Sequence, residues 1–287
     1  MEIRRTRAAD LPALHDIFIE AMAAVYRPHG FDPPAPPLEV FANQQLHVLA
    51  HDADGCAVAE DGGDPVGFAS AWVRGDTWFL ASLFVAPRAQ ARGVGKTLLD
   101  AVWGDGFLRR RTITDAIQPV SNMLYGRRGL VPATPVLWFG GRPRLEAGTD
   151  AGLEPADADD DDALRAIDAV AYGFDRSVDH ACWGRLARRM LWRRDGRVVA
   201  YSYVFPGHPV AIGPVGGVDG AAAASALGAE LARANGDVRV RIPGSSRDVV
   251  ATALAAGLRL APTPGLLLLG PGVPGPTSLA IGSYTLF

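Results

Sequence analysis

The chain has 287 residues, with 28 Lys and Arg against 31 Asp and Glu and a formal net charge of −3 at pH 7. This balance gives no electrostatic footprint for nucleic acid or an anionic membrane surface, and no apolar run approaches the roughly 20 residues of a bilayer span. The length predicts two domains, and two distant cysteines, Cys56 and Cys182, suit a reducing compartment. We expect a soluble cytoplasmic protein without a signal peptide.

In chain order, the first 140 residues predict the element order βααβββαβαβ. A strand over residues 2–6 precedes a helix that begins after Asp10, with Pro12 in its first turn. Glycine-containing turns at residues 61–64 and 74–76 predict two hairpins between three strands. The other expected elements are a helix over 38–49, strands over 56–60, 66–73 and 77–85, a helix from 96 to about 103, a strand over 111–117, a helix over 120–128 and a strand over 136–140.

The turn after the strand over 77–85 carries the strongest chemical signal. Its sequence is Gln-Ala-Arg-Gly-Val-Gly over residues 90–95, and a segment with helical spacing follows. The first turn of a helix offers unpaired N–H groups and the positive end of the helix dipole, and glycine gives an anion access to them. Arg92 and Lys96 add positive charge. The pattern predicts a phosphate site, and a plain strand-to-helix connection is the alternative.

Two common phosphate motifs are absent from this turn. Gly93 and Gly95 stand too close to Lys96 for the GxxxxGK[ST] of a P-loop, and Leu98 occupies the third glycine position of a dinucleotide fingerprint. The remaining pattern, [QR]-x-x-G-x-[GA] after an LFV-x-P strand, resembles the acyl-CoA pyrophosphate loop of the GNAT superfamily of N-acetyltransferases.

A second stretch, residues 118–130, resembles the family's N-x-x-A-x-x-x-Y-E-x-x-G-F segment. Tyr125 takes the tyrosine position, Gly129 the glycine position, and Leu130 replaces the usual Phe. The resemblance covers about 140 residues and implies an α/β (α+β) fold with a mixed, mostly antiparallel twisted sheet flanked by helices. It also implies acetyl-CoA as co-substrate and a strand over 77–85 that splays from its neighbour to bind the pantetheine arm. The cofactor-binding residues implied are Leu83, Phe84, Val85, Gln90, Ala91, Arg92, Gly93, Val94, Gly95, Lys96 and Thr97.

The resemblance implies direct acyl transfer from acyl-CoA to an amine. Tyr125 is then the group that protonates the departing thiolate, and a core tyrosine anchoring a short helix is the alternative. The general base is open, because Ala81 and Ser82 stand where many family members carry Glu or Asp. The candidates are Asp76, Glu39, His29 and His47, and a water chain or a partly neutral amine would serve as well.

The acceptor site is expected to be an apolar and aromatic cleft with few charges. Its expected lining residues are Tyr26, His29, Phe31 and Trp78. A metal site is not expected, because among the histidines of this half only His47 and His51 have i, i+4 spacing and no third ligand stands near them.

The second half repeats the plan of the first. Residues 3–17 align with residues 153–167 at a constant offset, and both halves end in Gly-Leu followed by a Pro-Thr-Pro or Pro-Ala-Thr-Pro stretch. The spacing from Val215 to Gly220 is too short for the phosphate loop, and Ala253 replaces Tyr125. The glycine-rich residues 212–217 leave a residual ligand site open. The expected elements are strands over 190–194, 197–204, 210–215, 237–242 and 265–269 and helices over 220–234 and 247–256.

The sequence therefore predicts a catalytic GNAT domain over residues 1–145 and a degenerate GNAT-like domain over 150–287 with a structural or substrate-shaping role. The predicted activity is N-acetyl transfer from acetyl-CoA to a primary amine of a small molecule or peptide. The alternatives are a CoA-binding sensor or scaffold without turnover and an acyltransferase that uses a longer acyl-CoA. Neither the acceptor nor the oligomeric state can be read from the sequence.

Overall fold

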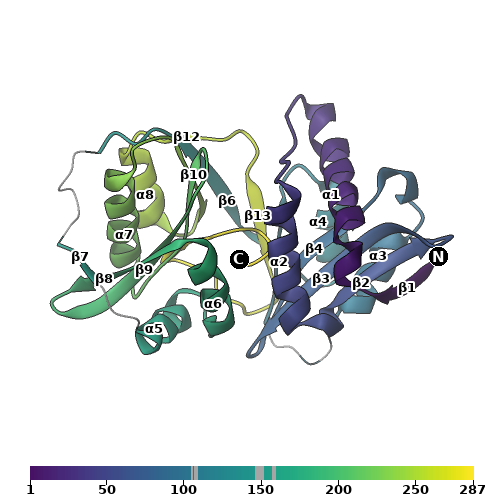
Figure 1. The fold of residues 1–287 in the computed structure, drawn as a ribbon, viewed down its shortest axis with the longest axis horizontal. Coiled ribbons are helices and arrows are strands. Elements are labelled where there is room, and N and C mark those ends of the chain that lie inside the picture. Colours follow the sequence, from purple (N-terminus) through teal and green to yellow (C-terminus); the bar gives the residue numbers. More distant parts are fainter. Residues whose placement is uncertain (105, 107–108, 146–151, 157–159) are drawn as a thin grey trace. The chain divides into compact units, whose positions relative to one another are not determined.

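The computed structural model describes residues 1–104, 106, 109–145, 152–156 and 160–287 (Figure 1). The chain divides into two compact units. Unit 1 comprises Met1–Thr112 and Ile117–Leu130, and unit 2 comprises Ile113–Ala116 and Val131–Phe287. Residues 146–149, at the expected domain boundary, and the first part of the acidic run over 157–162 lie outside the described residues.

The sheet of unit 1 has the strand order β1-β2-β3-β4-β5, antiparallel from β1 to β4 and parallel between β4 and β5. Every element expected in this unit is present. Its strands and helices are β1 (Glu2–Arg5), α1 (Leu11–Tyr26), α2 (Leu38–His51), β2 (Cys56–Asp61), β3 (Asp64–Arg74), β4 (Thr77–Val85), α3 (Val94–Val102), the first part of β5 (Arg109–Asp115) and α4 (Pro119–Gly126).

Side-chain alternation along β3 and β4 assigns the two faces of this sheet. Phe68 and Phe84 are cross-strand partners on one face, in a buried aromatic cluster with Phe41 of α2. Trp78 points to the other face, where its Nε1 donates to Val102 O of α3 at 3.2 Å. Helices α1 and α2 therefore cover one face of the sheet, and α3 covers the other (Figure 1).

From Glu154 to Ala255, unit 2 repeats the order βααβββαβα that unit 1 shows from Glu2 to Gly126, which confirms the tandem plan. Its sheet has the order β13-β6-β11-β10-β9-β8-β7, with β12 beside β6 and β14 beside β10. Its elements are β6 (Val131–Gly141), β7 (Glu154–Ala156), α5 (Asp161–Ala171), α6 (Ser177–Leu186), β8 (Arg188–Arg194), β9 (Arg197–Phe205), β10 (Val210–Gly217), α7 (Gly220–Arg233), β11 (Val238–Pro243), α8 (Arg247–Ala255), β12 (Arg259–Leu260), β13 (Gly265–Leu269) and β14 (Leu279–Ala280).

Strand β6 belongs to unit 2, although the sequence placed it at the end of the first domain. Val136 lies opposite Pro243 of β11 and Gly265 of β13. Phe139 is 3% exposed and packs in the core of unit 2. The partners of β6 in β11 and β13 lie about a hundred or more positions away along the chain. The compact units therefore divide the chain before β6 rather than near residue 145.

The core of unit 2 is built on the small side chains of α7. Ala222, Ala223 and Ala226 are 0% exposed, which brings the helix close to the sheet.

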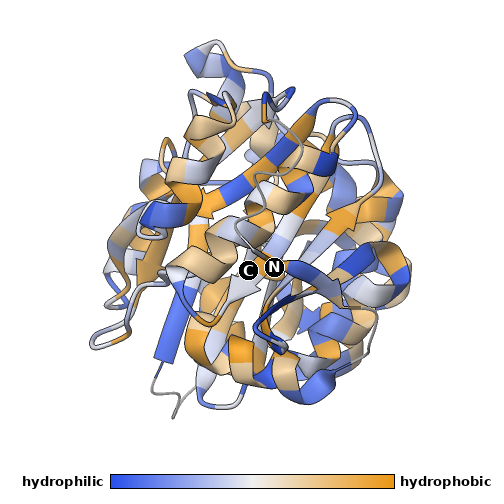
Figure 2. Cartoon of the chain, turned by 90° about the vertical axis from the view of Figure 1, so that its left-hand side faces the viewer, coloured by the Kyte–Doolittle hydropathy of each residue, from blue (hydrophilic) through white to orange (hydrophobic). Residues whose placement is uncertain are grey.

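Hydrophobic and hydrophilic stretches alternate along the helices, as expected for amphipathic helices (Figure 2). Within the described ranges, no helix is both long enough and apolar enough to cross a membrane.

Candidate functional site

The turn between β4 and α3 leaves the first turn of the helix open. Gly93 is the N-cap residue with φ of 81°, a left-handed conformation that favours glycine. Among the described residues, no side chain caps α3, and a Cβ on Gly93 would meet nothing within 4 Å. The backbone N–H groups of this turn and the positive end of the helix dipole are therefore accessible to an anion.

Two side chains of the predicted set hold this turn in shape. Gln90 Nε2 donates to Val85 O at 3.0 Å, which ties the turn to the end of β4. Thr97 Oγ1 donates to Gly93 O at 3.2 Å, which ties it to the helix. The turn is thus organised by its own residues.

Arg92 of the turn and Lys96 of the first turn of α3 each form an exposed ion pair. Arg92 pairs with Asp61 at 3.0 Å, and the Arg92 side chain is 57% exposed. Lys96 pairs with Asp100 at 2.8 Å and is 69% exposed. Exposed pairs contribute about 0–1 kcal/mol each, so both cations can exchange a carboxylate for a phosphate at low cost.

Strand β4 is paired on one edge for its full length and on the other edge for only part of it. The register with β5 runs from Thr77↔Arg109 to Leu80↔Thr112, and no further β4–β5 pair occurs among the described residues. On the β3 side, pairing continues to Val85, with Ala81 as an extra residue in β4. The backbone from Ala81 to Val85 therefore presents an edge with which no described strand of unit 1 pairs, and where an extended ligand can bind. Val85 O, at the end of this edge, accepts the hydrogen bond from Gln90.

A neutral, buried polar pair follows the extra residue of β4. Gln45 Nε2 donates to Ser82 Oγ at 3.0 Å, and the two residues are 6% and 5% exposed. Ser70, the cross-strand partner of Ser82, is 2% exposed, and its Oγ has no hydrogen-bond partner in the described part of the chain. The sequence reasoning missed Gln45. The available signal was its spacing between the buried Phe41 and Val48 on one face of α2.

Tyr125 lies near the end of α4 and is 4% exposed. Burial raises the pKa of its phenol above the usual value of 10.0, and a hydrogen bond with Ser121 acts weakly in the opposite direction. The hydroxyl therefore stays protonated across the physiological pH range. This state is required of a proton donor, and it is equally compatible with a core tyrosine.

The four residues expected to line the acceptor cleft are only partly brought together. Tyr26 ends α1 and is buried, and Phe31 N donates to Tyr26 O at 3.3 Å. His29 is exposed in the short turn between them. Trp78 does not join this group, because its side chain packs on the α3 face of the sheet.

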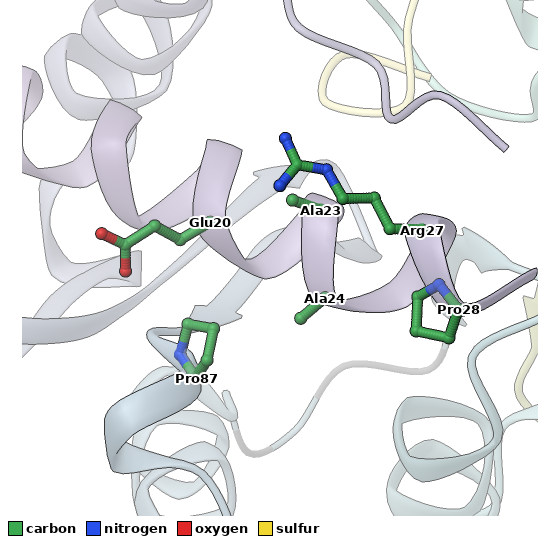
Figure 3. A pocket seen from close by; sticks show the side chains of 6 residues that line it. All are labelled: Glu20, Ala23, Ala24, Arg27, Pro28 and Pro87. Carbon is green, nitrogen blue, oxygen red and sulfur yellow. The ribbon is translucent and has the colours of Figure 1, made fainter. Parts of the chain in front are cut away.

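An open hollow of about 620 Å³ adjoins the same end of α1. In Figure 3, Pro87 faces the side of α1 that carries Ala24, and Arg27 and Pro28 lie at the end of the helix. Pro87 begins the turn that leads to residues 90–95, so the hollow lies next to the glycine turn. Its lining residues are Glu20, Ala23, Ala24, Arg27, Pro28 and Pro87.

Asp76, one candidate base, lies at the opposite end of β4 from the glycine turn. It precedes Thr77 and forms an exposed ion pair with Arg109 at 3.2 Å. Ser82 is six residues further along, or about 20 Å at the rise of a β-strand. Asp76 is therefore too distant to act where β4 and β5 separate.

The other candidate bases do not gather at one point either. Glu39 and His29 are exposed. His47 is buried with its ring 4.8 Å from that of His51, and it lies two positions from Gln45, on a different side of α2. Within the described residues, no group of three or more His, Cys, Asp or Glu side chains could hold a metal ion.

The corresponding helix start in unit 2 is closed. Asp219 is the N-cap of α7, and its carboxylate accepts a hydrogen bond from Ala222 N at 2.6 Å. The first turn therefore already carries a negative group where unit 1 leaves an open space. Ala253, the counterpart of Tyr125, is 0% exposed and has no hydroxyl.

Comparison with known proteins agrees with this geometry. Residues 11–122 match the acetyltransferase (GNAT) family. A Pyrococcus horikoshii protein assigned to the acetyltransferases has a TM-score of 0.76 at 20% identity, covering 99% of this chain and 95% of that chain. A GCN5-related N-acetyltransferase from Sphaerobacter thermophilus has a TM-score of 0.63 at 17% identity, covering 96% and 98%.

A tandem GNAT protein from the clavulanic acid biosynthesis pathway is also similar, with a TM-score of 0.58 at 15% identity and coverage of 96% of this chain and 99% of that chain. At these identities the likeness concerns the fold, and no curated protein matches the chain in sequence. Residues 11–122 are therefore an acetyltransferase domain of the GNAT family, within a chain that has the fold of a tandem GNAT protein.

Proposed function

We propose that unit 1 transfers an acetyl group from acetyl-CoA to a primary amine of a small molecule or peptide. The observation that carries the proposal is the uncapped start of α3, with Gly93 at its N-cap, directly after a strand whose second edge is unpaired beyond Leu80. The two features together suit a ligand with an anionic group and an extended arm. Acyl-CoA, the donor used by the GNAT family, has both.

In this proposal the glycine turn holds the pyrophosphate. The N–H groups of the first turn of α3 donate to the phosphate oxygens, and Arg92 and Lys96 exchange their exposed carboxylate partners for phosphate. The pantetheine arm lies along the free edge of β4 from Val85 towards Ala81. The acyl end then lies where β4 and β5 separate.

Tyr125 is the proposed proton donor. The amine nitrogen bonds to the thioester carbonyl carbon, the carbon–sulfur bond breaks, and the thiolate takes up a proton while the amine loses one. A buried phenol with a raised pKa stays protonated until the thiolate forms and can take up its proton. The polar groups beside the separation of β4 and β5, Ser82 and Gln45, are neutral, so we propose that the amine reaches the site in its neutral form or gives its proton to water.

The same neutral pair favours a second candidate function. A module that binds CoA as a sensor or scaffold needs the glycine turn and the strand edge but no base. Ser82 and Gln45 at the separation of β4 and β5 fit that reading. The third candidate is an acyltransferase that uses a longer acyl-CoA, and a comparison of turnover with acetyl-CoA and longer acyl-CoA substrates distinguishes it. The cytoplasmic location stays a prediction that rests on the composition.

The test combines binding with turnover. Calorimetry with acetyl-CoA measures affinity and stoichiometry, and an amine panel with detection of the released CoA thiol measures transfer. Binding with turnover on at least one amine supports the enzyme. Binding without turnover on any amine, with acetyl-CoA or with longer acyl-CoA, supports the sensor, and absence of binding contradicts both.

A further inference from the structure

In unit 2, a later segment of the same chain lies between β10 and β11. The parallel pairing of these strands runs only from Val210↔Val238 to Ile212↔Val240. Beyond that point β14 pairs with β10 through Val215↔Ala280 and Gly216↔Leu279, and Ile281 N donates to Arg241 O at 2.9 Å. Residues 278–287, called here the 278–287 segment, thus enter the gap that corresponds to the free edge of β4 in unit 1.

The strand portion of the segment is fully enclosed. Leu279 and Ala280 are 0% exposed and Ile281 is 1% exposed. Gly213 of β10 has φ of 135°, and a Cβ at this position would lie 2.5 Å from Ile281 O. A Cβ at position 213 would collide with the segment, so Gly213 admits it, whereas Gly216 and Gly217 lie close to the Tyr201 ring and to Ala223 of α7.

The far end of the segment is held by a buried cation. Arg176 is 0% exposed, and its Nη2 donates to Leu286 O at 2.9 Å and to Phe287 O at 2.5 Å. The Phe287 ring is 0% exposed and meets the Tyr172 ring edge-on, with centroids 5.4 Å apart at 85°. The guanidinium carbon of Arg176 lies 3.7 Å from the centroid of the same Tyr172 ring.

A polar network supports this pocket from α5, α6 and β9. Asp168 accepts from Tyr201 Oη at 2.6 Å and lies 2.8 Å from His180 Nε2. His180 Nδ1 lies 2.9 Å from Tyr203 Oη. By element order these three elements correspond to α1, α2 and β3 of unit 1. The segment therefore occupies the counterparts of both the strand edge and the face covered by the first two helices.

We propose that unit 2 is a peptide-binding module whose ligand is the chain's own 278–287 segment. The site takes an extended apolar peptide as an added strand, buries an aromatic side chain beyond it, and fixes the peptide carbonyls with a buried arginine. The fold of an acyl-CoA site is thus used for a peptide. This proposal does not depend on the activity proposed for unit 1.

The test uses the full chain with a protease site inserted at Gly272, an exposed residue in the turn before the segment. After cleavage we expect the fragment to stay with the protein in native size-exclusion chromatography. We also expect a fluorescent synthetic peptide of residues 276–287, but not its scrambled version, to bind nicked protein from which the fragment was displaced by mild urea. If the fragment leaves the nicked protein without urea and the melting temperature is unchanged, or the peptide fails to rebind, the proposal is wrong.

Arg176→Met and Arg185→Met form a matched pair on nicked protein. Arg176 begins the turn into α6, whereas Arg185 is exposed on the same helix. Loss of two hydrogen bonds to a charged group predicts fragment release at least about tenfold faster for Arg176→Met and unchanged release for Arg185→Met. If Arg176→Met does not fold, Phe287→Ala gives the same comparison. Equal release rates for the folded variants and the wild type overturn the assignment of these contacts.

Discussion

Asp219 in unit 2 takes the helix position that Gly93 takes in unit 1, and the two residues give their helices opposite N-termini. The Asp219 carboxylate accepts from Ala222 N at 2.6 Å, whereas α3 starts from a glycine with no side chain. A carboxylate here satisfies helix N–H groups and repels an incoming anion. Unit 2 therefore shows what a single substitution would do to unit 1.

We expect Gly93→Asp to abolish acetyl-CoA binding in a folded protein. The new carboxylate would cap α3 and place negative charge where the pyrophosphate binds. Calorimetric titration should show at least a hundredfold weaker binding, about 2.7 kcal/mol in free energy.

Gly75→Asp is the matched control for this substitution. Gly75 also has a positive φ, at 58°, and open space in front of its Cβ position, but it lies in the turn between β3 and β4. Gly75→Asp adds the same charge and similar backbone strain away from the glycine turn, so the affinity for acetyl-CoA should stay within about twofold of the wild type. Wild-type affinity in folded Gly93→Asp would show that the phosphates bind elsewhere.

Acetyl-CoA should bind with a stoichiometry of one per chain. The helix start of unit 2 is capped by Asp219, and the gap between β10 and β11 is filled by residues that include Leu279 and Ala280. Calorimetry on the full chain measures the ratio directly. A stoichiometry near two would reopen residues 212–217 as a ligand site.

Most helices and strands could be predicted from the sequence, because the residues that begin, end and pattern each element lie within it or next to it. The strand expected over residues 77–85 is β4 residue for residue, since Asp76 and Pro87 mark its ends and its composition is β-prone. The pairing of β6 could not be read, because it depends on β11 and β13, which follow much later in the chain. Helix α6 was missed because buried polar residues such as Asp179 and His180 interrupt its apolar pattern.

The same distinction holds for the site. The glycine turn was found because residues 90–95 are contiguous and their chemistry does not depend on remote contacts. The pair Gln45 and Ser82, and the contacts of Arg176 with the 278–287 segment, join elements that are far apart in the sequence. Such contacts exist only once the sheets have formed. The role of Tyr125 as the proton donor stays a prediction, because it depends on how the residue lies relative to bound acyl-CoA.

Asp168→Ala should strongly destabilise unit 2. The carboxylate is 0% exposed and serves both Tyr201 and His180, so its removal leaves buried polar groups without their partner. We expect the free energy of unfolding, measured by chemical denaturation, to fall by about 3–5 kcal/mol.

Asp162→Ala on the same helix is the control for Asp168→Ala. The Asp162 side chain is 90% exposed, and its removal should change the free energy of unfolding by less than about 0.5 kcal/mol. A loss below about 1 kcal/mol for Asp168→Ala would mean that the network carries little of the stability of unit 2.

Tyr125→Phe should lower kcat and leave the affinity for acetyl-CoA unchanged. Loss of a general acid typically costs about 10²–10⁴-fold in rate, whereas the ring itself and its packing are kept. Because burial raises the pKa of Tyr125, the wild-type rate should not fall through deprotonation of this residue up to about pH 10, where an ordinary tyrosine titrates. Tyr203→Phe in unit 2 is the control and should keep the wild-type kcat. Thiol release measured from pH 6 to 10 gives both the kcat of each variant and the pH dependence of the wild-type rate. An unchanged kcat in Tyr125→Phe would assign the proton to another donor or to water.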